Sequence, residues 1–332
     1  MKKPQAVANL ESAVVRLVRA RGAIARIELA RELKLVASTA GIYVDRLIER
    51  GYLVESVKAV RGLGRPPVMV ELNPQGGRFI GVDFDARQVM AVAVDFAQQP
   101  LEQVRRTIPP RATTARVLAI IESLVAEVIG SRRRDVLGIG LAVPGPIDPE
   151  QGISREYKFI RDWHDVAIGP QIAARFQVPV HVENNLRSLA LGELWCGQGR
   201  GLNHLVCLGI RSGIGSGIIA DGKLLGGANN RAGEIGRWIY SPSAKSAART
   251  IEDTVSLTAI LAEAQQRLAG GEASTLGKPG DAPTVAELLA AAAAGDELAL
   301  ELVQQAARVH GWVAHQLAQL LDPQRVIVAG PL

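Results

Sequence analysis

Cysteine is scarce in this chain, and long apolar runs are absent. Its two cysteines, Cys196 and Cys207, cannot form a disulfide framework or a four-ligand zinc site, which excludes the small disulfide-rich class of secreted proteins. No apolar stretch reaches the length that spans a bilayer, and Lys2 and Lys3 do not precede the apolar segment of a secretory signal peptide. We therefore expect reduced thiols and a cytoplasmic protein with no membrane partner.

A surplus of acidic residues is also missing, and the basic surplus lies at one end. Residues 1–75 hold 13 Lys and Arg against 7 Asp and Glu, a net charge of +6, whereas residues 76–332 hold 25 against 26, a net charge of −1. A basic head on a nearly neutral body suits a polyanionic partner such as double-stranded DNA. A solvated basic surface has the same composition, so charge alone does not decide between the two.

Three short helices and a β-hairpin are indicated in the basic head. Apolar residues recur at helical spacing over 10–18, 27–33 and 38–50, and Gly51 is well placed to end the third helix. Two β runs, 52–54 and 68–72, flank a basic tip rich in Gly and Pro. This order predicts a winged helix-turn-helix domain over residues 1–75.

The third helix and the basic tip are the elements expected to bind DNA. The helix can enter the major groove, while the tip reaches phosphates or the minor groove. The outward side chains of the third helix are poor hydrogen-bonding partners for bases, so modest sequence discrimination is expected. Ile42 on this helix can touch thymine methyl groups. A winged helix that makes only protein contacts is the alternative. The expected DNA-binding residues are Ser38, Thr39, Arg46, Arg61 and Arg65.

Strands alternate with helices after the head, which indicates a layered α/β domain over residues 76–332. Gly213 lies between two of the expected strands and Gly215 and Gly217 lie in the first half of the second, and we interpret this glycine-rich stretch as a tight turn between paired strands. The expected strands are 79–84, 89–96, 103–108, 136–143, 178–182, 205–210, 214–220 and 325–329, and the expected helices are 113–129, 184–195, 285–294 and 297–321.

Four stretches, the first at the end of the head and three in the α/β domain, are informative together. They are Gly64-Arg-Pro-Pro67, Val182-Glu-Asn-Asn185, Ser212-Gly-Ile-Gly-Ser-Gly-Ile-Ile219, and Asp221-Gly-Lys with Arg231-Ala-Gly-Glu-Ile-Gly236. Each glycine-rich stretch alone is a weak signal, but the combination is specific. From about residue 8 to its end the chain resembles the ROK family of repressors, open reading frames and kinases, in particular its xylose and N-acetylglucosamine repressors. The resemblance implies an actin-like, two-lobed sugar-kinase fold with a sugar site in the cleft between its lobes.

The residues that make family kinases catalytic are replaced in this chain. Their first phosphate loop reads Asp-x-Gly-Gly-Thr, whereas this chain reads Asp83-Phe84-Asp85-Ala86-Arg87, and the added carboxylate of Asp85 would repel phosphate. The family's catalytic base, the Asp of Glu-Asn-Asp, is Asn185 here, and an amide cannot act as a general base. We therefore expect no enzyme activity, no catalytic residue and no cofactor.

The zinc site of the family is also expected to be absent. Its His corresponds to Arg237, and its three-cysteine cluster falls in 241–251, which contains no cysteine. No metal ligand is therefore predicted for this chain.

Several positions that contact sugar in the family keep suitable side chains. Carboxylates and amides suit sugars because each can bridge neighbouring hydroxyl groups. Arg237 either binds an acidic or phosphorylated sugar or pairs with a nearby carboxylate as a structural tie. A vestigial cleft that binds nothing is the alternative. The expected effector-binding residues are Asn184, Asn185, Glu234, Arg237 and Glu252.

Three functions remain open from the sequence. The first, which we predict, is a homodimeric transcription regulator, a repressor, that binds an inverted-repeat operator and responds to a sugar-like effector. The second is an ATP-dependent sugar kinase with an appended DNA-binding head. The third is an oligomeric DNA-binding protein without an effector. Family members usually continue beyond the last strand with another helix and more sheet, so the C-terminus is expected to be truncated or naturally short.

Overall fold

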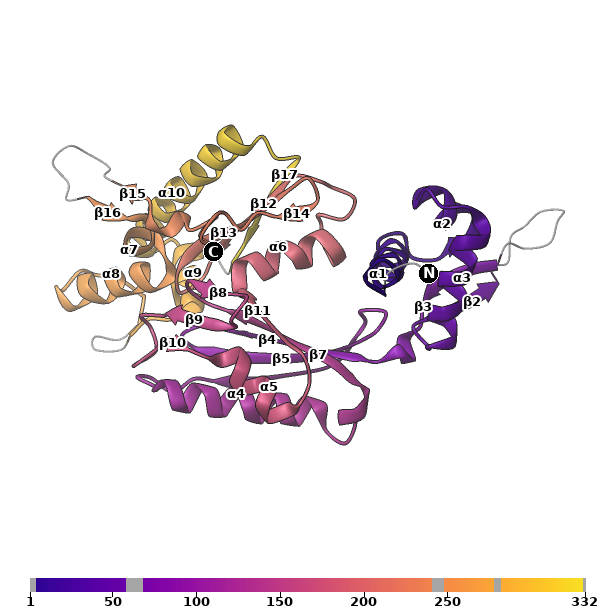
Figure 1. Cartoon of the computed structure of the whole chain (residues 1–332). Helices are drawn as coiled ribbons and strands as arrows, with labels where there is room; N and C mark the ends of the chain where they lie inside the picture. Colours follow the sequence, from indigo (N-terminus) through magenta and orange to yellow (C-terminus); the bar gives the residue numbers. More distant parts are fainter. Residues whose placement is uncertain (1–3, 58–67, 241–247, 278–281, 331–332) are drawn as a thin grey trace. The chain divides into compact units, whose positions relative to one another are not determined.

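The structure is a computed structural model that describes residues 4–57, 68–240, 248–277 and 282–330. The chain divides into two compact units (Figure 1). The first unit comprises residues 1–142 and 149–182, and the second comprises residues 143–148 and 183–332.

The first unit begins with three helices and a small sheet. Its N-terminal elements are α1 (Pro4–Arg21), β1 (Ile24–Ala25), α2 (Arg26–Glu32), α3 (Ala37–Glu49), β2 (Leu53–Val57) and β3 (Val68–Leu72). Strands β2 and β3 pair antiparallel with Leu53 opposite Leu72, and β1 adds to the other side of β3. This arrangement confirms the winged helix-turn-helix that the sequence predicts.

One apolar core holds the winged helix together. Val14 and Val18 of α1, Leu29 of α2, and Val44 and Leu47 of α3 are all buried and pack in a single cluster. The helical spacing of these residues puts them on the inner faces of their helices, which is why the sequence pattern located the helices correctly. Gly51 follows α3 with a φ of +76°, the left-handed conformation expected of a glycine at a helix end.

The remainder of the first unit is a five-stranded sheet with helices. Strand order is β11-β7-β4-β5-β6, with β4 antiparallel to β5 and parallel to β7. Figure 1 shows α4 running along one face of this sheet, and the apolar side of α4 is buried. The elements are η1 (Pro74–Gly76), β4 (Arg78–Phe84), β5 (Gln88–Asp95), β6 (Pro100–Thr107), α4 (Thr114–Ile129), η2 (Arg133–Asp135), β7 (Val136–Val143), β9 (Ile153–Glu156), β10 (His164–Val166), α5 (Ile168–Phe176) and β11 (Val180–Asn184).

Aromatic stacking joins the winged helix to this sheet. The Tyr52 ring stacks on Phe96 with a centroid distance of 5.1 Å, and Phe96 stacks on Phe79 of β4 at 6.0 Å. The side chain of Asn73 donates a 2.7 Å hydrogen bond to the Gly51 carbonyl oxygen. The ring contacts therefore connect the head to the sheet, and the Asn73 hydrogen bond holds the end of the head together.

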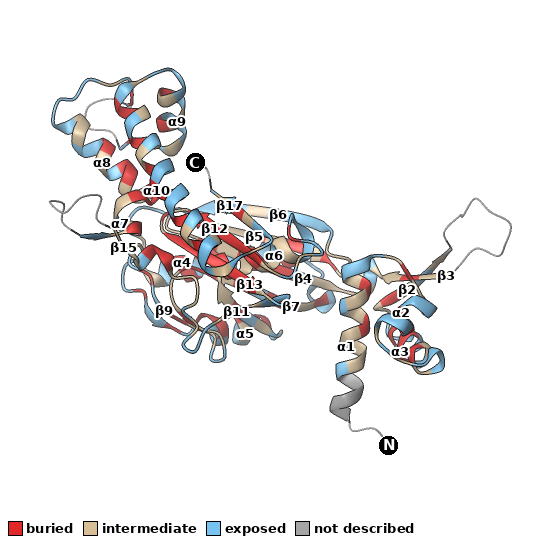
Figure 2. Ribbon diagram, turned by 90° about the horizontal axis from the view of Figure 1, so that it is seen from above, coloured by how far each residue is buried: buried red, intermediate tan, exposed pale blue. Residues whose placement is uncertain are grey.

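The second unit is built around a four-stranded sheet in the order β14-β13-β12-β17. Strand β12 is antiparallel to β13 and parallel to β17. Figure 2 shows β12 and β13 in red because they are buried along nearly their whole length. The elements are β8 (Ile147–Asp148), α6 (Asn185–Cys196), β12 (Leu205–Ile210), β13 (Ile214–Ala220), β14 (Lys223–Leu224), η3 (Ile235–Arg237), β15 (Ile239–Tyr240), β16 (Arg249–Thr250), α7 (Ile251–Val255), α8 (Leu257–Ala269), α9 (Val285–Ala293), α10 (Glu297–Leu321) and β17 (Arg325–Ala329).

The glycine-rich stretch forms the turn that the sequence predicts and also allows close packing of a helix on the sheet. Gly215 and Gly217 lie within β13, and a Cβ on Gly217 would come within 2.5 Å of the Ala190 side chain and the Leu186 backbone of α6. A Cβ on Gly215 would lie 2.8 Å from the Leu186 side chain. These glycines therefore let α6 pack closely on the sheet, as glycine does where elements approach each other tightly.

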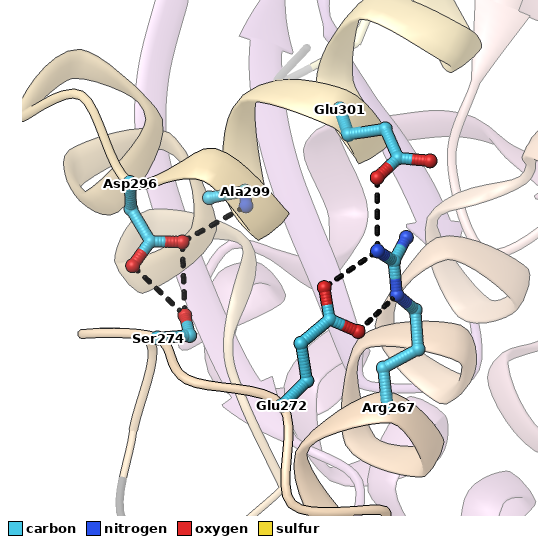
Figure 3. Close-up of polar contacts among 6 residues, drawn as sticks. All are labelled: Arg267, Glu272, Ser274, Asp296, Ala299 and Glu301. Atoms are coloured by element: carbon cyan, nitrogen blue, oxygen red, sulfur yellow. Dashed lines mark hydrogen bonds and ion pairs between the residues drawn. The ribbon is translucent and has the colours of Figure 1, made fainter.

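Polar contacts fasten the loop after α8 to the start of α10 (Figure 3). Arg267 donates two hydrogen bonds of 2.6 Å to Glu272 and one of 2.8 Å to Glu301. Asp296 caps α10 by accepting from the Ala299 N–H, and it also accepts from the Ser274 hydroxyl. Burial raises the pKa of Asp296, but these hydrogen bonds and those from the Thr275 N–H and hydroxyl lower it to about 2, and they stabilise the α10 N-terminus.

Candidate functional site

The α3 helix begins with its backbone N–H groups free of a side-chain cap. Its N-cap residue is Val36, no side chain caps the helix, and its first turn contains no acidic residue. Ser38 in this turn is exposed and Thr39 is half-buried. A helix N-terminus carries a partial positive charge and open donors, which suit a phosphate group.

The charged residues around α3 are partly neutralised by one another. Arg26 of α2 pairs with Asp45 of α3 at 2.7 Å and with Glu55 of β2 at 2.7 Å. Arg46 is exposed and lies over the Tyr43 ring at 5.9 Å from its centroid. The structure thus places Ser38, Thr39 and Arg46 on one helix, while Arg61 and Arg65 lie outside the residues that the structure describes.

In the second unit, Asn184 is used to build the start of α6. Its side-chain oxygen accepts from the Leu186 and Arg187 N–H groups at 2.9 and 3.2 Å, and its amide nitrogen donates to the Gly145 carbonyl oxygen at 3.0 Å. Asn185 is the first residue of α6 and is half-buried. Asn184 therefore caps the N-terminus of α6, and its contact with an effector stays a prediction.

Glu234, Arg237 and Glu252 come close together in the second unit. Burial raises the pKa of Glu234, while the charge of Arg237 lowers it and that of Glu252 raises it. The Arg237 Nε lies 3.8 Å from a Glu234 carboxylate oxygen, and the Arg237 side chain is largely exposed. Glu252 accepts a hydrogen bond from the Ile214 N–H at 3.2 Å. Two carboxylates and a guanidinium at one place can bind hydroxyl groups or an anion.

Arg187 is a site residue that sequence reasoning missed. Its side chain is buried, donates to the Asn230 carbonyl oxygen at 3.3 Å, and lies 3.3 Å from the Glu183 carboxylate. No hydrogen-bond partner for its buried Nε is found among the described residues. Arg187 thus links the start of α6 to the loop that leads to Glu234. The i,i+4 spacing of Glu183 and Arg187 was the signal that could have revealed it.

The loop that replaces the kinase phosphate loop lies in the first unit. There the Asp85 carboxylate accepts from the N–H groups of Arg87 and Gln88 at 2.7 and 3.0 Å. Asp85 therefore stabilises the β4–β5 turn, and it occupies backbone N–H donors that a phosphate would need. Trp163, in the same unit, donates its indole N–H to the Ser154 hydroxyl at 2.7 Å.

Within the described ranges, no three His, Cys, Asp or Glu side chains are grouped to hold a metal ion. Residues 241–247, where part of the family's cysteine cluster would fall, are outside those ranges, so the absence of zinc stays a prediction. No helix that the structure describes is long and apolar enough to cross a membrane.

The model of the ROK family matches residues 79–332. The chain belongs to the ROK family. A transcriptional regulator of Mycobacterium tuberculosis is 30% identical to this ROK chain over 325 residues, which cover 96% of this chain and 74% of that protein. The DNA-binding transcriptional dual regulator NagC of Escherichia coli is 26% identical over 329 residues, which cover 97% of this chain and 80% of NagC.

Solved structures agree with this assignment. A ROK family transcriptional regulator described as a homologue of the E. coli Mlc protein matches with a TM-score of 0.79 and 26% identity, over 97% of this chain and 82% of that one. A ROK family glucokinase of Streptomyces griseus and a ROK hexokinase of Thermus thermophilus match a smaller share of this chain, 76%, with lower TM-scores of 0.66 and 0.58, at 28% and 25% identity and over 83% and 81% of those chains. The predicted family and fold are thereby confirmed.

One variant, Arg237→Ala, can separate the two interpretations of Arg237. Because its pairing with Glu234 is long and exposed, Arg237→Ala should lower the melting temperature by about 1 °C or less, since exposed ion pairs contribute little. If Arg237 binds an anionic sugar, the same variant should lose the thermal stabilisation that gluconate or glucose 6-phosphate gives the wild type. Differential scanning fluorimetry measures both. A much lower melting temperature without ligand would instead identify a structural tie.

Proposed function

We propose that this ROK protein is a DNA-binding transcription regulator, a repressor, with a winged-helix head over residues 1–75 and a ROK domain over residues 76–332. The observation that carries the proposal is the uncapped N-terminus of α3, presented with exposed Ser38 on the helix of a winged helix-turn-helix. Regulators that match 96–97% of the chain, head included, support it. The protein would act in the cytoplasm as a homodimer on an inverted repeat.

A sugar or sugar derivative is the effector that we propose. The second unit supplies carboxylates at Glu234 and Glu252 and cations at Arg237 and buried Arg187 within one region. Such groups hydrogen-bond neighbouring hydroxyls, and burial raises the pKa of Glu234. An effector that binds one conformation of the protein better than another would shift its affinity for the operator.

The DNA-binding head can be tested through its salt dependence. Arg61→Ala with Arg65→Ala should weaken binding to every duplex, and the slope of log K against log salt should fall by roughly one per lost phosphate contact. Fluorescence anisotropy with labelled duplexes between 50 and 200 mM salt measures this. The control is Arg111→Ala with Arg116→Ala, two exposed arginines of the ROK domain. An unchanged slope in the Arg61 and Arg65 variant would show that the wing does not contact phosphate.

We further propose that the protein has no sugar-kinase activity. Asn185 cannot take a proton from a sugar hydroxyl, and Asp85 occupies donors in the phosphate loop. A coupled assay with ATP and hexoses, pentoses or amino sugars should show no turnover above a mock purification. Asn185→Asp alone should remain inactive because the phosphate loop is still changed. Turnover that Asn185→Ala abolishes would favour the alternative, a kinase with an appended DNA-binding head.

A further inference from the structure

We propose that Ile42 recognises thymine methyl groups, so that this protein reads T·A base pairs in its operator mainly by apolar contact. The proposal rests on the DNA-binding function proposed above. It specifies which chemical feature of the duplex the recognition helix detects.

Helix α3 offers few groups that can hydrogen-bond to a base edge. The helix, Ala37–Glu49, contains no Asn or Gln, which pair in a bidentate way with adenine, and no Lys. The nearby Arg26 guanidinium is held by the Asp45 and Glu55 carboxylates, with contacts of 2.7 to 2.8 Å. This pairing occupies one oxygen of the Asp45 carboxylate. The other polar side chains of the helix that are not buried are Ser38, Thr39, Arg46 and Glu49, and Glu49 lies at its C-terminal end.

Apolar side chains are exposed on α3 and close to it in the sequence. Ile42 is 53% exposed on α3, Val36 is 68% exposed at its N-cap, and Ile27 is 73% exposed in the first turn of α2. These are three of the eleven large hydrophobic side chains that are exposed among the described residues, and they fall within sixteen residues of sequence. Val36 and Ile42 both belong to the N-terminal half of α3 and its cap, so this end of the helix presents apolar groups to a partner.

Charge favours DNA as the partner of this surface. The first turn of α3 is uncapped and free of acidic residues, and residues 1–75 carry a net charge of +6, both of which favour a polyanion. Residues in the N-terminal part of a recognition helix contact base edges, and Ile42 is the sixth residue of α3. The C5-methyl group of thymine is the apolar group of the major groove.

The experiment removes the methyl group without changing base pairing. A duplex is first selected from a randomised pool by the full-length protein, and each thymine of that duplex is then replaced singly by deoxyuridine. Deoxyuridine keeps the O4 acceptor and lacks only the methyl. Because burying one methyl is equivalent to about a fourfold change in affinity, we expect a loss of about fourfold at one or two positions of each half-site.

Two variants assign the effect to a residue. Ile42→Ala should bind the thymine duplex more weakly and should no longer distinguish thymine from deoxyuridine at those positions. Ile239→Ala, which changes an isoleucine 67% exposed on β15 in the second unit, should bind and discriminate as the wild type does. Analytical ultracentrifugation of each variant checks that assembly is unchanged.

The possible outcomes separate this proposal from the proposed function. A selected duplex whose affinity is insensitive to every methyl, or an Ile42→Ala variant with full methyl sensitivity, overturns the proposal and leaves DNA binding intact. If Ile42→Ala changes the oligomeric state and not the methyl sensitivity, the surface joins copies of the chain, and the proposal is also overturned. Failure to select any duplex overturns the DNA-binding function and this proposal with it.

Discussion

Gly233→Ala is expected to destabilise the protein by about 3 kcal/mol or more, a large part of the free energy of unfolding of an ordinary domain. Gly233 has a φ of +89°, and a Cβ there would overlap the backbone carbonyl of Ser216 in β13. The Ser216 N–H also donates to the Gly233 carbonyl oxygen at 2.8 Å, so moving the glycine breaks a backbone hydrogen bond. Because Gly233 directly precedes Glu234, the effector region should be disrupted together with the sheet. Urea unfolding followed by circular dichroism measures the loss.

A second glycine provides a matched control for this result. Gly295, between α9 and α10, has the same φ of +89°, but nothing lies within 4 Å of the position of its Cβ. Gly295→Ala should therefore cost only the conformational penalty, about 1 kcal/mol. Equal losses in the two variants would show that the contact with Ser216 does not matter.

Arg187→Ala should also cause a large loss, about 3 kcal/mol, because it leaves the Glu183 carboxylate without its cation in a partly buried place. Burial already raises the pKa of Glu183, and the charge of Arg187 opposes this rise. Removing Arg187 therefore raises the pKa of Glu183 further. A carboxyl whose pKa is higher in the folded state contributes stability below its ordinary pKa near 4.5, and this stability is lost as pH rises through the folded pKa. The deficit of the variant should thus be larger at pH 7 than at pH 4.5.

Two further variants test the electrostatic cause of this effect. Adding Glu183→Gln to Arg187→Ala should recover part of the stability at pH 7. Arg267→Ala should cost only about 1 kcal/mol, although Arg267 makes shorter hydrogen bonds than Arg187, because its ion pairs lie near the surface (Figure 3). If the Arg187→Ala deficit is the same at both pH values, lost packing rather than an unpaired carboxylate is its cause.

Most elements with a strong apolar period could be predicted from the sequence. Strands β7, β12, β13 and β17 and helix α10 have the predicted bounds, and α3 differs by one residue at each end. Long or buried segments repeat their apolar residues over many positions, so the polar residues around them do not obscure the apolar period. The sequence analysis did not predict α5, α7 or α8, and the two-residue strand β1 has too few residues for any period.

The site was harder to predict because its contacts are long-range. Sequence reasoning selected Asn184 for its amide but did not anticipate that both ends of the amide are bonded within the protein. The Arg187 link to Asn230 spans 43 residues and depends on tertiary structure. The pairing of Arg26 with Asp45 and Glu55, which limits the chemistry of the recognition helix, likewise joins three separate elements. The sequence indicates which polar side chains the site contains, whereas the tertiary structure decides which of them are already hydrogen-bonded or paired within the protein.

The stack of Tyr52, Phe96 and Phe79 has a consequence for how the DNA-binding head diffuses in solution. A head joined by a flexible tether tumbles with the rotational correlation time of a small domain, whereas ring stacking at 5.1 and 6.0 Å couples the head to the five-stranded sheet of the first unit. Such coupling would reduce the rotational freedom that the head loses when it binds DNA, as we propose it does.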